Sequence, residues 1–226
     1  MDSLRARFFA AILVSLMASQ LCFGGITTIG PFAGDFSESF ESFPAGPIPG
    51  TSTELSGPAS ILSGQGILTG VHTIAFNPTY VWNSTGGFSL GTNGTAVPFD
   101  GLQGLALNSV STFHPTVRFE FPTPVTDFGG YWVHAKTSTQ GGPVDLTFYD
   151  ATDTVIGTDD FTYTSSLGGV SEWYGWNSTT PIGAVEFTGF FAGVDGVQIK
   201  VPEPSTCIFL TAAALGTLRR RQLNIS

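Results

Sequence analysis

One serine stands in a pattern typical of hydrolase nucleophiles. The run Gly87-Phe88-Ser89-Leu90-Gly91 matches G-x-S-x-G, in which the serine sits on a sharp turn between a buried strand and a helix. Here the stretch from Thr92 to Pro98 follows, and its Thr, Asn, Gly and Pro residues disfavour a helix. We therefore interpret Ser89 as part of a Gly-rich hairpin loop and not as a nucleophile.

The histidines and acidic pairs form no convincing catalytic set either. Three histidines are widely separated in the sequence: His72, His114 and His134. None has the H-x-H or H-x-x-x-H spacing of a zinc site. The pairs Asp150/Asp153 and Asp159/Asp160 stand at apparent turns, where Asp side chains serve backbone hydrogen bonds. We predict that the protein is not an enzyme and has no catalytic residues.

An aromatic cluster is the other candidate for a site. Trp173, Tyr174 and Trp176 stand within four positions of one another. Exposed rings of this kind can stack on the apolar face of a pyranose and so contact a glycan. The alternative is that the rings fill the core of a β-sheet protein, as aromatic residues commonly do. The sequence leaves both interpretations open.

The elements that must position these residues are strands. Gly, Pro, Asn, Ser and Thr interrupt the chain at short intervals, and no apolar pattern of helical period lasts three turns. Apolar and polar residues alternate over 117–121, which predicts a strand ended by Pro122 and Pro124. Residues 144–156 predict two strands joined by a tight turn at Asp150 to Thr154. Further strands are expected near 36–43, 59–68, 79–82, 102–110, 161–163, 172–176, 184–190 and 196–201. So many short strands favour an all-β antiparallel β-sandwich.

Charge and cysteine content narrow the function classes. Between Gly25 and Val201 there are three basic and fifteen acidic residues, a formal charge of −12. Nucleic-acid binding is excluded, because it requires clustered Lys and Arg. Both cysteines, Cys22 and Cys207, lie in the terminal segments, so no disulfide stabilises the part between them. That part must rely on core burial.

The two ends of the chain indicate export. Arg5 and Arg7 precede an apolar run over 8–18, which predicts a signal helix within a signal peptide over 1–24. Cys22 raises lipidation as an alternative, against which stand Gln20 and Leu21 in place of small residues. At the other end the apolar segment from Thr206 to Leu218 has 13 residues, short for a transmembrane helix of about 20.

The carboxyl end also carries a recognisable order of features. Val201-Pro202-Glu203-Pro204-Ser205 is followed by the short apolar segment and then by Arg219-Arg220-Arg221. This order resembles the PEP-CTERM sorting signal of bacterial exported proteins. The resemblance implies processing by an exosortase-type protease, transient anchoring in the inner membrane by the C-terminal helix, and final placement at the cell surface or outside the cell. An ordinary tail anchor is the alternative.

A second resemblance covers the middle of the chain. The segments 39–43, 121–130 and 194–199 look like parts of the jelly-roll domains found ahead of such tails, which are similar in outline to carbohydrate-binding β-sandwiches. In those modules an acid of the first strand and an Asp of the last often share a structural calcium ion. Carried over, the resemblance nominates Glu41 and Asp195 as ligands of one Ca²⁺. Gly196 departs from the pattern, since a second Asp or Asn is common there.

These observations divide the chain into a signal peptide (1–24), a β-sandwich exported domain (25–200) and a PEP-CTERM sorting signal (201–226). The expected function is that of a non-enzymatic, structural or interaction protein of the cell surface or extracellular matrix, with exopolysaccharide as a candidate partner. The alternative is a carbohydrate-binding module or a glycan-active enzyme on the same jelly-roll fold.

Overall fold

A computed structural model describes most of the middle of the chain: residues 25–43, 52–54, 58–71, 79–83, 88–89, 95–96, 99–107, 116–134, 144–161, 171–189 and 192–203. The signal helix predicted over 1–24 and the segment from Pro204 to Ser226 lie outside these residues. Within them, no helix has the length and apolar character needed to cross a membrane.

The described chain is almost entirely strand. Its first elements are β1 (Ile26–Ile29), β2 (Phe36–Glu38), β3 (Ser52–Glu54), β4 (Ala59–Ile61), the 3-10 turn η1 (Leu62–Gly64), β5 (Gly66–Val71), β6 (Thr79–Asn83), β7 (Phe88–Ser89) and β8 (Thr95–Ala96). Then follow β9 (Gln103–Leu107), β10 (Thr116–His134), β11 (Val144–Tyr149), β12 (Val155–Phe161), β13 (Glu172–Thr188) and β14 (Ala192–Lys200). All of the pairings are antiparallel, so the prediction of an all-β antiparallel protein is confirmed.

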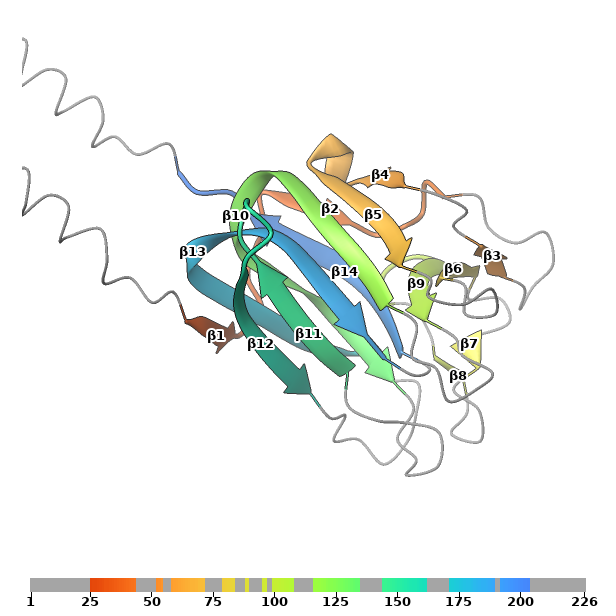
Figure 1. Cartoon of the computed structure of the whole chain (residues 1–226). Coiled ribbons are helices and arrows are strands. Elements are labelled where there is room, and N and C mark those ends of the chain that lie inside the picture. Colours follow the sequence, from red (N-terminus) through yellow and green to blue (C-terminus); the bar gives the residue numbers. More distant parts are fainter. Residues whose placement is uncertain are drawn as a thin grey trace, which may run out of the picture.

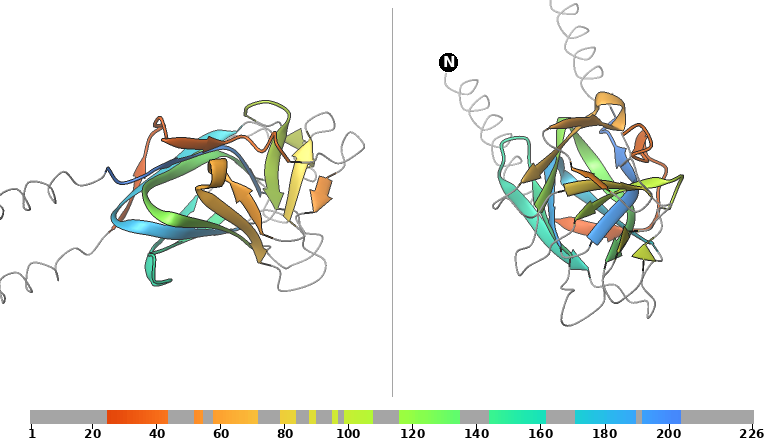
Figure 2. Two further views of the ribbon diagram at one scale, coloured as in Figure 1. Left: turned by 90° about the horizontal axis from the view of Figure 1, so that it is seen from above. Right: turned by 90° about the vertical axis from the view of Figure 1, so that its right-hand side faces the viewer.

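Two long strands divide the 12-stranded sheet into two layers (Figure 1). The first half of β10 and the second half of β13 pair with β5 and β11, and β4 and β12 extend this layer, which we call the Arg118 layer. The other halves of the same strands pair with β14 and β1, and β9, β6 and β3 continue this second layer, which we call the Trp173 layer. Figure 2 shows β10 and β13 curling round at one end of the molecule.

Both long strands bend at positions where the sequence predicted the end of a strand or a gap between two strands. The register of β10 with β13 shifts between Glu120 and Val125, and Pro122 and Pro124 lie in this interval. Because proline has no N–H to give to a ladder, it is tolerated where pairing is interrupted. The expectation that the prolines end the strand is therefore wrong, since pairing resumes at Val125. The separate strands expected over 172–176 and 184–190 are likewise one strand, β13.

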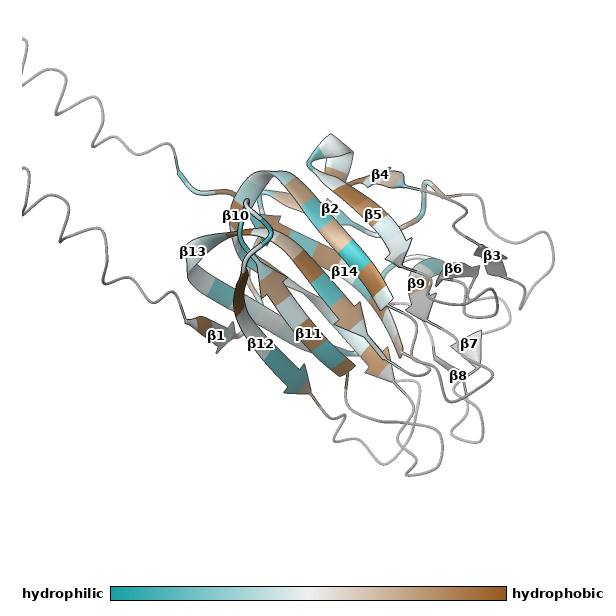
Figure 3. Cartoon of the chain, viewed as in Figure 1, coloured by the Kyte–Doolittle hydropathy of each residue, from teal (hydrophilic) through white to brown (hydrophobic). Residues whose placement is uncertain are grey.

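The core lies between the two layers and is rich in aromatic rings. Alternation of apolar and polar residues along β10, β11 and β13 is visible in Figure 3. Phe119 of the Arg118 layer contacts Phe128 of the Trp173 layer, with ring centroids 5.4 Å apart. Phe187 meets Trp132 across the same interior at 5.0 Å. Burial of such large rings supplies the stability that a cysteine-free domain needs.

The turn between β11 and β12 has the geometry that its sequence predicts. The Oδ1 atom of Asp150 accepts hydrogen bonds from the backbone N–H groups of Thr152 and Thr154, at 2.8 and 3.0 Å. Asp153 has a φ of 65°, a left-handed conformation that Asp tolerates better than most residues. The predicted tight turn at Asp150 to Thr154 is confirmed.

Candidate functional site

The predicted aromatic cluster is split between the two sides of β13. Trp176 points inward and is fully buried, and its Nε1 donates to Asp159 Oδ2 at 2.6 Å. Tyr174 also lies on the inner side and stacks on Phe161, with centroids 4.1 Å apart. Trp173 projects from the opposite, outer side and stays partly exposed. The nomination of Trp176 as a glycan contact is therefore wrong, because a ring without exposed surface cannot meet a ligand.

Two paired glycines make room for Trp173 on the outer face of its layer. Gly129 of β10 pairs directly with Gly175 of β13. A Cβ atom on Gly129 would lie 2.7 Å from Trp173 Cζ2, and one on Gly175 would lie 2.9 Å from Trp173 Nε1. The indole thus occupies the space that two side chains would fill. Its Nε1 donates to the carbonyl oxygen of Ile29 at 3.3 Å, which connects it to the neighbouring strand β1.

Trp173 is the centre of a row of rings that crosses the layer. Phe32, which follows β1, meets Trp173 edge to face at 5.4 Å, and Tyr131 of β10 meets it at 5.2 Å from the other side. Phe99 stacks on Tyr131 with centroids 3.3 Å apart and an interplanar angle of 5°. We call these four residues, Phe32, Trp173, Tyr131 and Phe99, the aromatic row. Three of them are partly exposed and Phe99 is 52% exposed.

Three members of this row lie outside the aromatic cluster predicted from the sequence. Phe32, Tyr131 and Phe99 are far apart in the chain, and only the strand order β1, β13, β10, β14 brings them together. One signal was available for Tyr131. Tyr131 lies on the same side of β10 as Gly129, whereas Phe128, Gly130 and Trp132 lie on the inward side. Alternation along the strand therefore places Tyr131 on the outer face.

Two carboxylates hold the segment that carries Phe99. Asp195 Oδ2 accepts the backbone N–H of Asp100 at 2.7 Å, and Oδ1 accepts that of Gly196 at 2.6 Å. Glu41 Oε1 accepts the N–H groups of Leu102 and Gln103 at 2.5 and 2.6 Å. Glu41 and Asp195, which the jelly-roll resemblance nominated together, thus bind the same short segment. Their partners are main-chain N–H groups.

The groups around Glu41 and Asp195 fit the predicted calcium site only in part. Gln103 Oε1 is buried without a hydrogen-bond partner among the described residues and would add an oxygen ligand beside Glu41. The N–H groups that point at both carboxylates, however, already supply positive charge where a cation would sit. In the part of the chain that the structure covers, no group of three or more His, Cys, Asp or Glu residues is placed to hold a metal. Calcium stays a prediction of the resemblance, and a melting temperature lowered by EDTA would support it.

Burial also changes the acidity of Asp195, which is 1% exposed. Desolvation raises its pKa from the ordinary 3.8 to about 6, and the hydrogen bonds from Asp100, Gly196 and Phe99 oppose this rise. The nearby charge of Asp100 raises the pKa further. The charge of Asp195 therefore changes close to neutral pH, and Asp195 is one of the two carboxylates that hold the segment with Phe99.

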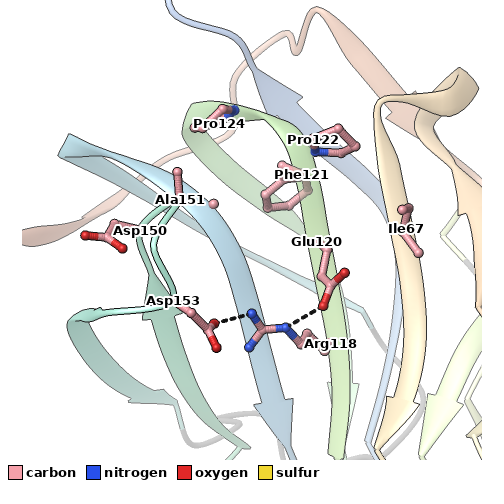
Figure 4. Close-up of a pocket in the computed structure, with 10 residues that line it drawn as sticks. Ile67, Arg118, Glu120, Phe121, Pro122, Pro124, Asp150, Ala151 and Asp153 are labelled. Carbon is pink, nitrogen blue, oxygen red and sulfur yellow. Dashed lines mark hydrogen bonds and ion pairs between the residues drawn. The ribbon is translucent and has the colours of Figure 1, made fainter.

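The outer face of the Arg118 layer carries a different cluster (Figure 4). Arg118 forms ion pairs with Asp153, with Glu120 at 2.9 Å and with Glu186 at 2.9 Å. Burial lowers the pKa of Arg118, but its hydrogen bonds to these three acids more than offset this and keep the pKa above its ordinary value. The cavity beside it, of about 420 Å³, is lined in part by Phe121 and Ile67. Because three carboxylates surround the guanidinium, this cluster is suited to joining strands and not to binding an anion.

The weak catalytic candidates gain nothing from the structure. Ser89 of β7 pairs with Thr95 of β8 in a small antiparallel hairpin. This agrees with the hairpin interpretation of the G-x-S-x-G run. His134 ends β10, while His72 and His114 lie outside the described residues. Asp159 is engaged by Trp176, and Asp150 caps its own turn.

Comparison with known proteins gives likenesses of fold only. No protein-family profile and no curated protein matches the sequence. One similar solved structure is the enzymatically active domain of tailspike protein 4 of bacteriophage CBA120, with 13% identity over 61% of this chain, 19% of that chain and a TM-score of 0.33. This chain thus spans about a fifth of the tailspike chain.

Another similar solved structure is the CBM22-1 xylan-binding domain from Paenibacillus barcinonensis, with 13% identity over 78% of this chain, 100% of that chain and a TM-score of 0.31. A third is the K1 cleaved adhesin domain of Lys-gingipain from Porphyromonas gingivalis, with 16% identity over 78% and 99% of the two chains and a TM-score of 0.32. None of these likenesses assigns a role to a residue here.

The two tryptophans of β13 should differ sharply in their effect on stability. Trp176→Ala removes a fully buried ring and should lower the free energy of unfolding by about 3–5 kcal/mol. Trp173→Ala removes a partly exposed ring and should cost about 1 kcal/mol. Urea denaturation followed by circular dichroism measures both. Equal losses for the two variants would contradict the assignment of Trp173 to the outer face.

The acidity of Asp195 predicts a pH dependence of stability. Because its pKa in the folded protein lies above that of an exposed Asp, the folded state binds the proton more tightly than the unfolded state does. Its contribution to stability is complete below about pH 4 and is lost as pH rises through about 6. The contribution of Asp195 to the melting temperature should therefore be larger at pH 5 than at pH 7. The rise in melting temperature between these two pH values should be smaller in the Asp195→Asn variant. Identical pH profiles for the two proteins would exclude Asp195 as the source.

Proposed function

We propose that this protein is an exported, non-enzymatic interaction protein of the cell surface or extracellular matrix, and that its jelly-roll-like β-sandwich contacts polysaccharide. The observation that carries the proposal is the outward Trp173, set over the glycine pair Gly129 and Gly175 and flanked by other partly exposed rings. An indole that lies over a glycine pair in this way offers a flat apolar surface of the kind on which a pyranose stacks.

The destination of the protein is proposed from its ends. The amino-terminal signal and the carboxyl-terminal order of Pro-Glu-Pro, apolar segment and arginines support export through a PEP-CTERM route. That route would bring the chain to an exosortase-type protease while the inner membrane holds its tail. In the folded domain, β1 and the end of β14 lie at the same end of the molecule (Figure 1).

The non-enzymatic assignment is supported by how the acidic residues are used. Glycoside hydrolysis needs two carboxyl groups that face each other across a cleft. The acids that sequence analysis weighed as pairs are engaged in turns and core contacts instead: Asp150 in its turn and Asp159 with Trp176. Polysaccharide contact without turnover is therefore the function that the geometry supports best.

Polysaccharide binding should depend on Trp173. The full-length chain in mild detergent is applied to a panel of immobilised bacterial and plant polysaccharides, and bound protein is measured. Trp173→Ala should reduce binding about tenfold or more, since the stacking surface at the centre of the row is removed. Val155→Ala is the matched control, because Val155 is 54% exposed on β12 of the other layer. Turnover of a polysaccharide by the protein would instead overturn the non-enzymatic part of the proposal.

The sorting proposal predicts a change of location. Deletion of Val201 to Ser226 should alter the division of the protein between cells and medium, because the proposed anchor and cleavage signal are lost. Fractionation with immunoblotting measures the division, and mass spectrometry measures the end of the mature chain. Release of a chain that still ends in the arginines, with no change on deletion, would argue against a processed sorting signal.

A further inference from the structure

We propose that the aromatic row is the binding site of an extended, uncharged glycan chain that runs across the strands of the Trp173 layer, with Phe99 as one end of the site. This inference rests on the proposed polysaccharide contact. It adds which residues form the site, that the ligand is the interior of a chain and not a single terminal sugar, and that neutral glycans are preferred over acidic ones.

The length of the row indicates a chain. Trp173 lies on β13, Tyr131 on its neighbour β10, and Phe99 lies against Gly196 of the next strand, β14. Neighbouring strands are about 4.8 Å apart. That spacing is comparable to the length of one sugar unit in an extended polysaccharide. A chain that crosses the strands can therefore meet first Trp173 and then the stacked pair of Tyr131 and Phe99. Phe32 extends the row beyond β13 on the other side.

The Phe99 end is rigid, although Phe99 itself is exposed. Gly196 has a φ of 56°, and a Cβ there would lie 3.3 Å from both the Phe99 and Tyr131 rings, so the glycine lets both rings stand on the strand. Asp195 and Glu41 hold the main chain on both sides of Gly101, as described above. A ring fixed before the ligand arrives loses little conformational entropy on binding, so it contributes more affinity. Asp195 and Glu41 are thus positioning residues for this end of the site.

A polar pair borders the row on the same face. Asp127 pairs with Asn177, Gly129 with Gly175, and Tyr131 with Trp173, so these pairs succeed one another along the outer side of β10 and β13. Asn177 Nδ2 donates to Asp127 Oδ1 at 2.8 Å. Amide and carboxylate groups beside stacking rings can hydrogen-bond to sugar hydroxyls and fix the orientation of the chain.

The charge around the row favours a neutral ligand. Asp127, Asp195, Asp100 and Glu41 lie beside the row or beneath its Phe99 end, and Lys200, which pairs with Asp127, is the one basic residue near them within the described ranges. Arg118 lies on the other layer and is paired with three acids. An acidic glycan would bring like charges together, which costs free energy and selects against such partners.

The test compares short and long ligands. Full-length protein in mild detergent is titrated by calorimetry with neutral oligosaccharides of the cello-, xylo- and manno-series, each with two or with six sugar units, and with oligogalacturonate as the acidic probe. A six-unit neutral ligand should bind about tenfold or more tightly than its two-unit counterpart. The acidic probe should bind at least tenfold more weakly than the best neutral ligand.

Variants at the Phe99 end make the test specific. Phe99→Ala should lose most of the advantage of the six-unit ligand over the two-unit ligand, whereas Phe99→Tyr, which keeps a ring, should retain that advantage. Leu102→Ala is the matched control, since Leu102 is 53% exposed on the same segment but outside the row. Asp195→Asn and Glu41→Gln should weaken the six-unit ligand more than the two-unit ligand.

The outcomes separate this inference from the proposed function. No binding to any neutral glycan, or binding that Trp173→Ala leaves intact, overturns both. Binding that requires Trp173 but shows no gain with chain length, or none lost in Phe99→Ala, overturns the extended site alone. Preference for the acidic probe overturns the assignment of a neutral ligand.

Discussion

The antiparallel pairing of β10 with β13 is the constraint on which the rest of the structure depends. These two strands run through both layers, and their shared bend converts one sheet into a sandwich. Because side chains alternate along a strand, the same pair supplies inward rings to the core and outward rings to the surface. The site and the core are thus two sides of one ladder, and a shift of register by one residue would exchange them.

Much of the fold follows from residue patterns that are local. Alternation of apolar and polar residues predicted the strands, and Asp150 to Thr154 has the composition of the turn that it forms. What local patterns could not supply is the continuity of pairing. Pro122 and Pro124 stop a ladder in most contexts, and only the partner strand, which bends at the same level, allows β10 to continue beyond them.

Only part of the candidate site could be predicted, because its residues come from strands whose pairing is not visible in local patterns. Trp173 lies on the outer face of its layer, but strand alternation places Trp176 and Tyr174, its neighbours in the predicted cluster, on the opposite side. Phe32 and Phe99 could not be found, because their contact with the row depends on which strands are neighbours. Sequence separation hides such sites until the order of strands in the sheet is known.

Several acidic side chains in this protein accept hydrogen bonds from backbone N–H groups that are distant in the sequence. They connect chain segments that no disulfide joins. Besides Glu41 and Asp195, Glu38 accepts the N–H groups of Phe40 and Leu62. Asp35 accepts the N–H of Val201 at 2.9 Å, so the contacts of the domain extend to the residue just before the Pro-Glu-Pro stretch. Val201 is thus part of the folded domain, and ending the chain before it would remove a hydrogen bond that joins the end of β14 to the residue before β2.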